Sequence, residues 1–275
     1  MNGAESLVRT LIASDVNVCF ANPGTSEMHF VAALDRVEGI RCVLGLFEGV
    51  VTGAADTYYR IAEKPASTLL HLGPGLGNGI SNLHNAKKAR SGIVNIVGEH
   101  AGYHIKHDAP LTADIEGIAR PVSHWVKTSP DARSVAADAA AAVEAARCAP
   151  GCIATLILPA DTAWNEADGP ATAKPPAPRP KINAEAIKAG ARALRAGSGA
   201  AILLGGAALR GRALESAGRI TACTGCKLFS EFNTARAECG AGRVNAPRLP
   251  FVVDQALAVL AGTRELVLVG AKTPV

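Results

Sequence analysis

The alternation of short apolar runs with helical patterns is the feature that most constrains how this chain can fold. In the first part of the chain the runs are residues 16–20, 40–46, 67–72, 92–97 and 153–158. The segments between them, such as 49–62 and 79–89, space their apolar residues as amphipathic helices do. A strand that is apolar on both faces is buried on both sides, which is typical of a parallel sheet covered by helices. The sequence therefore predicts an α/β fold with a doubly wound parallel sheet.

A proline-rich stretch divides the chain. Residues 166–181 include all five prolines of NEADGPATAKPPAPRPK, and proline fixes φ and removes a hydrogen-bond donor. We expect an extended linker here, between a first domain over 1–165 and a second over 182–275. Helix and strand patterns alternate again in the second domain, which is expected to be a smaller Rossmann-like unit. Because the chain ends with GAKTPV directly after a predicted strand, we expect this domain to be incomplete and the chain to be a fragment or a truncated product.

Charge and composition exclude several classes of function. The formal net charge is +4, the basic residues are scattered and aromatic residues make up 4%, which argues against a nucleic-acid partner. No stretch approaches the roughly 20 apolar residues of a membrane span, and the N-terminus lacks the pattern of a signal peptide. The expected location is the cytoplasm.

The seven cysteines give no clear metal site. Cys19 and Cys42 lie in apolar runs and are expected to be small buried hydrophobic residues. Cys223 and Cys226 form a C-x-x-C pair, but no second pair follows at metal-binding spacing. Ordinary packing is therefore predicted for this pair, with a zinc or redox site as the alternative. No carboxylate pair follows a strand at magnesium-binding spacing, so no metal ligand is assigned.

Polar residues and glycines follow four of the predicted strands. In open α/β sheets ligands bind outside the carboxyl ends of the strands, where these segments converge. The sequence therefore predicts a ligand site on this edge. Its candidate residues are Asn22, Pro23, Gly24, Thr25, Glu48, His71, Gly73, Pro74, Gly75, Asn78 and Glu99.

Each candidate also has a structural interpretation. The sequence GPGLGNG lacks the third glycine of G-x-G-x-x-G and the lysine of a P-loop, so it is equally a plain turn. His71 could be a core histidine with a satisfied hydrogen bond. Glu48 and Glu99 could be charges that compensate the macrodipole at the start of a helix.

The motifs taken together resemble a known family. In chain order they are NPGTSE (22–27), FEGVVTGAADTYYR (47–60), HLGPGLGN (71–78), IVNIVGEH (93–100), RPVSHWVKT (120–128) and LILPADT (156–162). This series resembles the pyrimidine-binding domain of thiamine-diphosphate enzymes, in the group of the acetolactate synthase large subunit and benzoylformate decarboxylase. The resemblance covers residues 1–165 and continues over 182–275 as part of the family's central domain.

The resemblance implies a thiamine-diphosphate-dependent 2-oxo acid enzyme, acetolactate synthase-like, that decarboxylates and joins its substrates. Glu48 would hydrogen-bond the aminopyrimidine of the cofactor and His71 would transfer protons as a second catalytic residue. For Glu48 we expect an apolar surround that raises its pKa. The flanking residues that would supply it are Leu44, Leu46, Phe47, Val50 and Val51.

The same resemblance assigns the remaining candidates. Thr25, His71 and Glu99 would contact the substrate, and the other cofactor-binding residues would be Asn22, Pro23, Gly24, Gly73, Pro74, Gly75 and Asn78. Phe47 and Gly49 depart from the acetolactate synthase pattern. Thr25 together with His71 favours the alternative, a benzoylformate-type 2-oxo acid decarboxylase.

The family's diphosphate and Mg²⁺ are held by a third domain, often across a dimer, and some relatives bind FAD in the central domain. From the resemblance we expect a homodimer or tetramer with Mg²⁺ outside residues 1–275 and FAD as an optional cofactor. The isolated chain is expected to bind the cofactor weakly and to be inactive. A further alternative is a truncated, non-catalytic partner of a complete paralogue.

Overall fold

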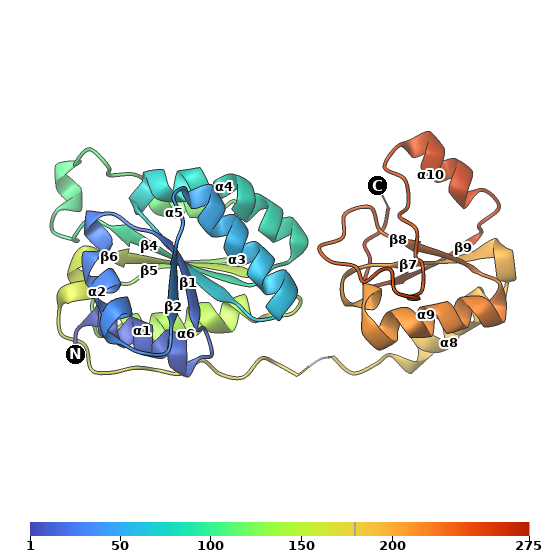
Figure 1. The fold of residues 1–275 in the computed structure, drawn as a ribbon, viewed down its shortest axis with the longest axis horizontal. Coiled ribbons are helices and arrows are strands. Elements are labelled where there is room, and N and C mark those ends of the chain that lie inside the picture. Colours follow the sequence, from blue (N-terminus) through green and yellow to red (C-terminus); the bar gives the residue numbers. More distant parts are fainter. Residues whose placement is uncertain (179, 275) are drawn as a thin grey trace. The chain divides into compact units, whose positions relative to one another are not determined.

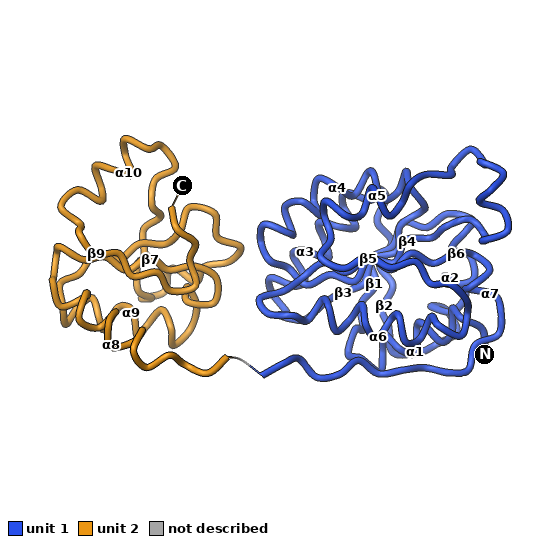
Figure 2. Tube along the Cα trace, turned by 180° about the vertical axis from the view of Figure 1, so that it is seen from behind, with its two compact units in different colours: residues 1–178 blue, residues 179–275 orange. Residues whose placement is uncertain are grey.

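The chain forms two compact units that divide between residues 178 and 179 (Figures 1 and 2). The computed structural model describes residues 1–178 and 180–274. The first half of the stretch predicted as a linker lies along the first unit. The Ala171 N–H donates to Thr10 Oγ1 at 3.0 Å and the Ala173 N–H donates to Ser14 Oγ at 2.9 Å. Two hydroxyls at the end of the first helix thus satisfy backbone donors of the stretch that was expected to be a linker.

The first unit contains a six-stranded parallel sheet in the order β2-β1-β3-β4-β6-β5. The strands are β1 (Val18–Asn22), β2 (Arg41–Leu44), β3 (Ala66–Leu70), β4 (Ile93–Glu99), β5 (Trp125–Thr128) and β6 (Ile153–Pro159). Every residue of β3, β4 and β6 is buried. The predicted doubly wound α/β fold is confirmed.

Helices cover both faces of this sheet (Figure 1). They are α1 (Gly3–Ala13), α2 (Met28–Arg36), α3 (Glu48–Ala62), α4 (Leu72–Ala89), α5 (Ile115–Ala119), α6 (Val135–Ala146) and α7 (Ala160–Trp164). Helices α3, α4 and α5 pack on one face, and α1, α2, α6 and α7 pack on the other. Short 3₁₀ turns lie at Thr25–Glu27 and Ile105–His107.

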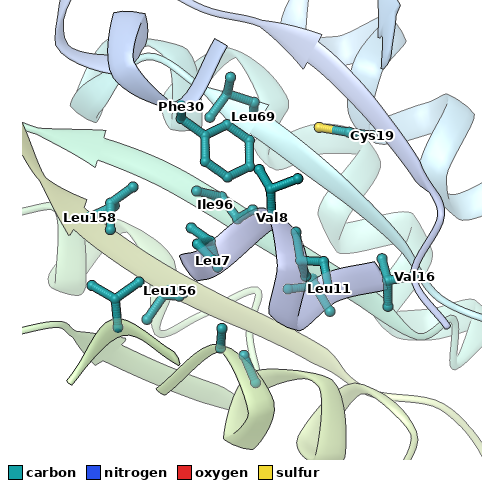
Figure 3. Packing of buried hydrophobic residues seen from close by; sticks show 14 of the residues in the cluster. Leu7, Val8, Leu11, Val16, Cys19, Phe30, Leu69, Ile96, Leu156 and Leu158 are labelled. Carbon is teal, nitrogen blue, oxygen red and sulfur yellow. The ribbon is translucent and has the colours of Figure 1, made fainter. Parts of the chain in front are cut away.

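Alternate residues of the central strands enter two separate apolar clusters. On β4, Ile93 and Val97 pack with α3 and α4, whereas Val94 and Ile96 pack with α1, α2 and α6. Figure 3 shows the second cluster, with Phe30 of α2 near Ile96 and the leucines of α1. The near-continuous apolar character of these runs therefore follows from burial on both sides.

Two elements differ from the sequence prediction. Strand β5 was not predicted, because it is a short edge strand in which Lys127 is exposed and the flanking residues are only partly buried. Helix α4 begins at Leu72 and not at residue 79, so the glycine-rich stretch is helical. A Cβ at Gly73 would lie 2.4 Å from the Cβ of Ala113; tight packing rather than a turn explains this glycine.

The second unit has a three-stranded parallel sheet in the order β8-β7-β9. Its strands are β7 (Ala200–Leu204), β8 (Lys227–Ser230) and β9 (Glu265–Val269), and its helices are α8 (Ala184–Leu194), α9 (Gly211–Thr224) and α10 (Val253–Leu260). A 3₁₀ turn, Gly206–Leu209, lies between β7 and α9. None of the helices in either described part of the chain has the length and apolar character needed to cross a membrane.

A chain of buried side-chain hydrogen bonds crosses the middle of the larger sheet. Thr68 Oγ1 donates to Asn95 Oδ1 at 2.8 Å, and Asn95 Nδ2 donates to Thr155 Oγ1 at 3.1 Å. The Thr155 hydroxyl also bonds the Ser123 hydroxyl at 2.7 Å. Thr68, Asn95 and Thr155 are in direct register on β3, β4 and β6. Because all three are fully buried, each depends on the others for its hydrogen bonds.

We predict that Asn95→Ala destabilises the first unit by about 2–4 kcal/mol, since it leaves a cavity, removes the acceptor of the Thr68 hydroxyl and removes one of the two partners of the Thr155 hydroxyl. Urea unfolding followed by tryptophan fluorescence measures this, because both tryptophans, Trp125 and Trp164, lie in this unit. The control is Asn85→Ala on the exposed face of α4, for which a change of at most ~0.5 kcal/mol is expected. Equal effects of the two substitutions would contradict a structural role for the buried chain.

Candidate active site

The predicted residues gather where β1 and β3 end. In the order β2-β1-β3-β4 the chain runs outward from β1 in one direction and from β3 in the other, so this is the point where ligands bind in open α/β sheets. Asn22 is the last residue of β1 and His71 directly follows β3. Helices α3 and α4 begin beside them at Glu48 and Leu72.

A hydrogen bond between a buried carboxyl group and a histidine joins the two strand ends. His71 Nδ1 lies 2.7 Å from Glu27 Oε2, and the Gly24 N–H donates to the same oxygen at 2.7 Å. The Glu27 side chain is 1% exposed and the His71 side chain 21%. An Nδ1–H donated to this carboxylate leaves Nε2 as the ring atom available for proton exchange.

The imidazole ring of His71 packs directly against Gly24 in the turn that follows β1. A Cβ at Gly24 would lie 2.4 Å from His71 Nδ1, so the imidazole needs a glycine at this position. The next residue, Leu72, is fully buried with φ of +49°. A leucine in the left-handed region costs on the order of 1–3 kcal/mol, and such strain is concentrated at functional sites.

Glu27 lies close to a second buried carboxylate. Its Oε1 atom is buried and has no hydrogen-bond partner among the described residues, because it packs against Gly98, where a Cβ would lie 1.5 Å away. Burial raises the pKa of Glu27, against the hydrogen bond from Gly24 and the charge of His71. Burial also raises the pKa of Glu99, and the charge of Glu27 adds to this effect. The site therefore holds two carboxyls for which the neutral form is favoured by burial.

Glu48 is the first residue of α3 and lies over the glycine-rich start of α4. Asn78 Nδ2 donates to Glu48 Oε2 at 3.0 Å. A Cβ at Gly75 would lie 3.4 Å from Glu48 Oε1, and this oxygen has no partner among the residues that the structure describes. One carboxylate oxygen is thus fixed by the protein and the other is available to a ligand.

Packing between α3 and α4 determines where Glu48 lies. Thr52 Oγ1 contacts the carbonyls of Glu48 and Gly79 at 3.0 and 3.1 Å. Asn82 Nδ2 donates to the Gly49 carbonyl at 2.6 Å. These polar contacts bind the first turn of α3 to the second turn of α4, so the carboxylate is held by two rigid helices.

The apolar surround that we expected for Glu48 is not formed within this chain. Of the five flanking residues only Val51 is buried, and Leu46 is 89% exposed. Leu44, Phe47 and Val50 are also exposed. The reason is that β2 is the outermost strand of the sheet, so the chain that follows it has no neighbour on its outer side among the described residues.

The other candidates are placed as follows. Asn22 Nδ2 donates to the Gly45 carbonyl at 2.7 Å and so joins the ends of β1 and β2. Thr25 and Pro74 are exposed and Pro23 is partly buried, and Thr25 begins the short 3₁₀ turn that carries Glu27. Among residues 1–178 and 180–274 no group of His, Cys, Asp and Glu side chains is arranged to hold a metal ion.

Glu27 was not among the site residues predicted from the sequence. The available signal was its spacing: a glutamate three residues after the Gly24 turn can bond back to the N–H of the residue that begins a helical turn, as Glu27 does. Its contact with His71 joins residues 44 positions apart and leaves no local trace in the sequence.

The chain is similar to several known proteins. Residues 1–118 match the family model described as the thiamine pyrophosphate enzyme N-terminal TPP binding domain. IlvX, a candidate acetolactate synthase large subunit of Mycobacterium tuberculosis, is 50% identical over 277 residues, which is 100% of this chain and 53% of that protein. Benzoylformate decarboxylase of Pseudomonas aeruginosa is 32% identical over 143 residues, which is 52% of this chain and 27% of that protein.

A solved structure shows the same fold. The thiamine diphosphate-dependent 4-hydroxybenzoylformate decarboxylase of Rhodococcus jostii RHA1 superposes with a TM-score of 0.80 at 22% identity, over 98% of this chain and 52% of that one. The fold and site define an α/β protein with a candidate ligand site at the switch point of its sheet. Through residues 1–118 the chain is similar to the thiamine pyrophosphate enzymes. The chain covers 53% of IlvX and 52% of the Rhodococcus jostii structure, so it spans about half the length of these relatives.

The raised pKa of Glu27 predicts how stability depends on pH. A carboxyl whose pKa is higher in the folded than in the unfolded state contributes stability below its unfolded pKa, about 4.3, and loses this contribution as the pH rises through the folded value. Glu27→Gln cannot titrate. The stability of the wild type relative to Glu27→Gln should therefore fall as the pH is raised from about 4 towards neutrality.

Urea unfolding of the first unit at a series of pH values, followed by tryptophan fluorescence, measures this difference. Glu38→Gln removes the same charge at an exposed position and serves as the matched control. A wild type that gains stability over Glu27→Gln as the pH rises would contradict the assignment of burial as the main influence on Glu27.

Proposed function

We propose that this chain provides the aminopyrimidine-binding half of a thiamine diphosphate-dependent 2-oxo acid enzyme, acetolactate synthase-like, that decarboxylates a 2-oxo acid and joins the product to a second one. The observation that carries the proposal is the Glu48 carboxylate at the start of α3, with Oε2 fixed by Asn78 and Oε1 beside Gly75. The fold by itself does not require a carboxylate at position 48.

The residues present fit the aminopyrimidine part of the cofactor. Glu48 Oε1 is an oxygen without a protein partner among the described residues, and a Cβ at the nearby Gly77 would meet no atom within 4 Å. A planar ring with a hydrogen-bonding nitrogen can therefore approach the carboxylate. When bound, thiamine diphosphate supplies an electron sink for the carbanion that decarboxylation generates. Mg²⁺ is proposed to accompany the diphosphate, with no residue of this chain assigned to it, and FAD is not required.

Each protein group has a distinct role in this proposal. Glu48 holds a proton at its free oxygen, facing the ring nitrogen. Glu27 accepts the His71 Nδ1–H and fixes the tautomer, so that His71 exchanges protons with substrate through Nε2. The Gly24 N–H keeps Glu27 in place. Glu27 is thus a positioning residue, and His71 and Glu48 are the catalytic residues.

The second candidate is decarboxylation of benzoylformate type, in which an aldehyde is released and no second substrate is joined. The Glu27–His71 pair favours it, because it places a ready proton donor at the site. Thr25, exposed at the start of the same turn, adds a hydroxyl that can bind a substrate carboxylate.

A partner subunit is part of the proposal. Leu44, Leu46, Phe47 and Val50 form an exposed apolar cluster around the half-buried Glu48, and contiguous patches of this kind mark interaction sites. We propose that a second subunit covers the cluster in a cytoplasmic homodimer or tetramer and completes the dry surround of Glu48. The non-catalytic alternative, pairing with a complete paralogue, uses the same surface.

The proposal is tested in a chimera that joins residues 1–275 to the part of the Mycobacterium tuberculosis relative that this chain does not cover. The alignment of the two proteins includes 100% of this chain. With thiamine diphosphate and Mg²⁺, we expect acetolactate from pyruvate. Glu48→Gln should lower kcat by about 10²-fold or more, because proton transfer by a positioned carboxyl contributes 10²–10⁴-fold. Product analysis with pyruvate and with benzoylformate measures both points.

Glu63→Gln, at the far end of α3, is the matched control and should leave kcat unchanged. Release of benzaldehyde from benzoylformate without acetolactate would favour the second candidate. A folded chimera that turns over neither substrate, or one in which Glu48→Gln remains fully active, would overturn a catalytic role and leave the pairing function.

A further inference from the structure

Two cysteines face each other across the outermost pair of strands of the larger sheet. Cys19 of β1 is in register with Cys42 of β2, so both side chains lie on the same face. Neighbouring strands lie about 4.8 Å apart, which is within the range of roughly 4.4–6.8 Å for the Cα atoms of disulfide-bonded residues.

The two thiols have different environments. Cys19 is fully buried in the apolar cluster with Val8 and Leu69 (Figure 3), whereas Cys42 is exposed on the edge strand. The expectation that both are buried hydrophobic residues is therefore wrong for Cys42. The hydrogen bond from Cys19 lowers the pKa of Cys42 to about 7. The same contact with Cys42, together with burial, raises the pKa of Cys19.

We propose that Cys19 and Cys42 are a redox modification site, which a peroxide converts to a disulfide between β1 and β2. Cys42 is the reactive residue because an oxidant can reach it. Cys19 is the resolving residue because it lies directly opposite and stays shielded from the oxidant. A thiolate that is accessible and has a resolving cysteine next to it is the arrangement found in redox-sensitive sites.

The chemistry needs one equivalent of hydrogen peroxide. The Cys42 thiolate attacks one peroxide oxygen, the O–O bond breaks, and the hydroxide that leaves is protonated to water. Cys42 is then a sulfenic acid. The Cys19 sulfur attacks the Cys42 sulfur, the S–O bond breaks, and the hydroxide leaves with the Cys19 proton as a second water. Two thiols and one peroxide give one disulfide and two waters.

The cross-link would lie on the two segments that lead into the site. Three residues beyond Cys19, Asn22 bonds the Gly45 carbonyl, and three residues beyond Cys42 the Gly45 N–H donates to the Ala21 carbonyl at 2.9 Å. Glu48 follows three residues later. Oxidation would therefore join covalently the two strand ends that support the Gly24 turn and the start of α3.

The test treats the full chain with hydrogen peroxide, alkylates the remaining thiols and digests it with trypsin without reduction. Cleavage after Arg9, Arg36, Arg41 and Arg60 places Cys19 in residues 10–36 and Cys42 in residues 42–60. Mass spectrometry should find these two peptides joined, two hydrogens lighter than their sum, and separated again by dithiothreitol. This measurement needs no variant, so a failure of folding cannot obscure it.

Variants then separate the roles of the two residues. In Cys19→Ala, Cys42 should stop at the sulfenic acid, which dimedone traps. Its alkylation by iodoacetamide at pH 7 should slow roughly three- to fourfold, because an ordinary thiol pKa near 8.5 leaves about 3% thiolate and the higher nucleophilicity of the more basic thiolate offsets part of this loss. Cys239→Ser, at another exposed cysteine, should leave the cross-link unchanged. Wild-type Cys42 that is oxidised to sulfinic acid without a cross-link, or that joins another cysteine, would overturn the proposal.

Discussion

One carboxylate buried between two strand ends holds the site together. Glu27 lies in the 3₁₀ turn that follows β1, and it bonds both the Gly24 backbone and the imidazole that follows β3. An ionised carboxylate is costly to bury without partners, so this position is occupied only because a backbone N–H and a histidine offset the cost. Removing the histidine would leave the buried carboxylate with the Gly24 N–H alone to offset this cost. The positions of β1, β3 and His71 are therefore coupled through a single side chain.

The two acids near the switch point are stabilised in different ways. Glu27 is enclosed by its own chain, which supplies Gly24, His71 and the close approach of Gly98. Glu48 has one hydrogen bond within the chain, from Asn78, and its apolar neighbours remain exposed. The first arrangement is complete in a monomer and serves to fix a histidine. The second is open on one side, as expected for a group that meets a ligand there.

Much of this could be predicted from the sequence, for physical reasons that also explain the failures. Strands β3, β4 and β6 are buried on both faces, so their apolar runs were unambiguous, and the rule that parallel strands end at one edge brought Glu48 and His71 together. The start of α4 was misplaced because glycine and proline are read as turn residues, although here Gly73 is required by close packing and lies within a helix. Glu27 was missed because its partner is distant in sequence.

The position of β2 at the edge of the sheet accounts both for the accessible thiol of Cys42 and for the exposed apolar residues before Glu48. Three of its four residues, Cys42, Val43 and Leu44, are apolar, so the sequence gave little sign that the strand lacks an outer neighbour among the described residues. That position leaves Cys42 accessible while its register partner stays buried. It also leaves Leu44 and Leu46 uncovered on the way to Glu48. Reactivity of the thiol pair and incompleteness of the Glu48 surround thus have one cause, and a subunit that covered this edge would reduce both together.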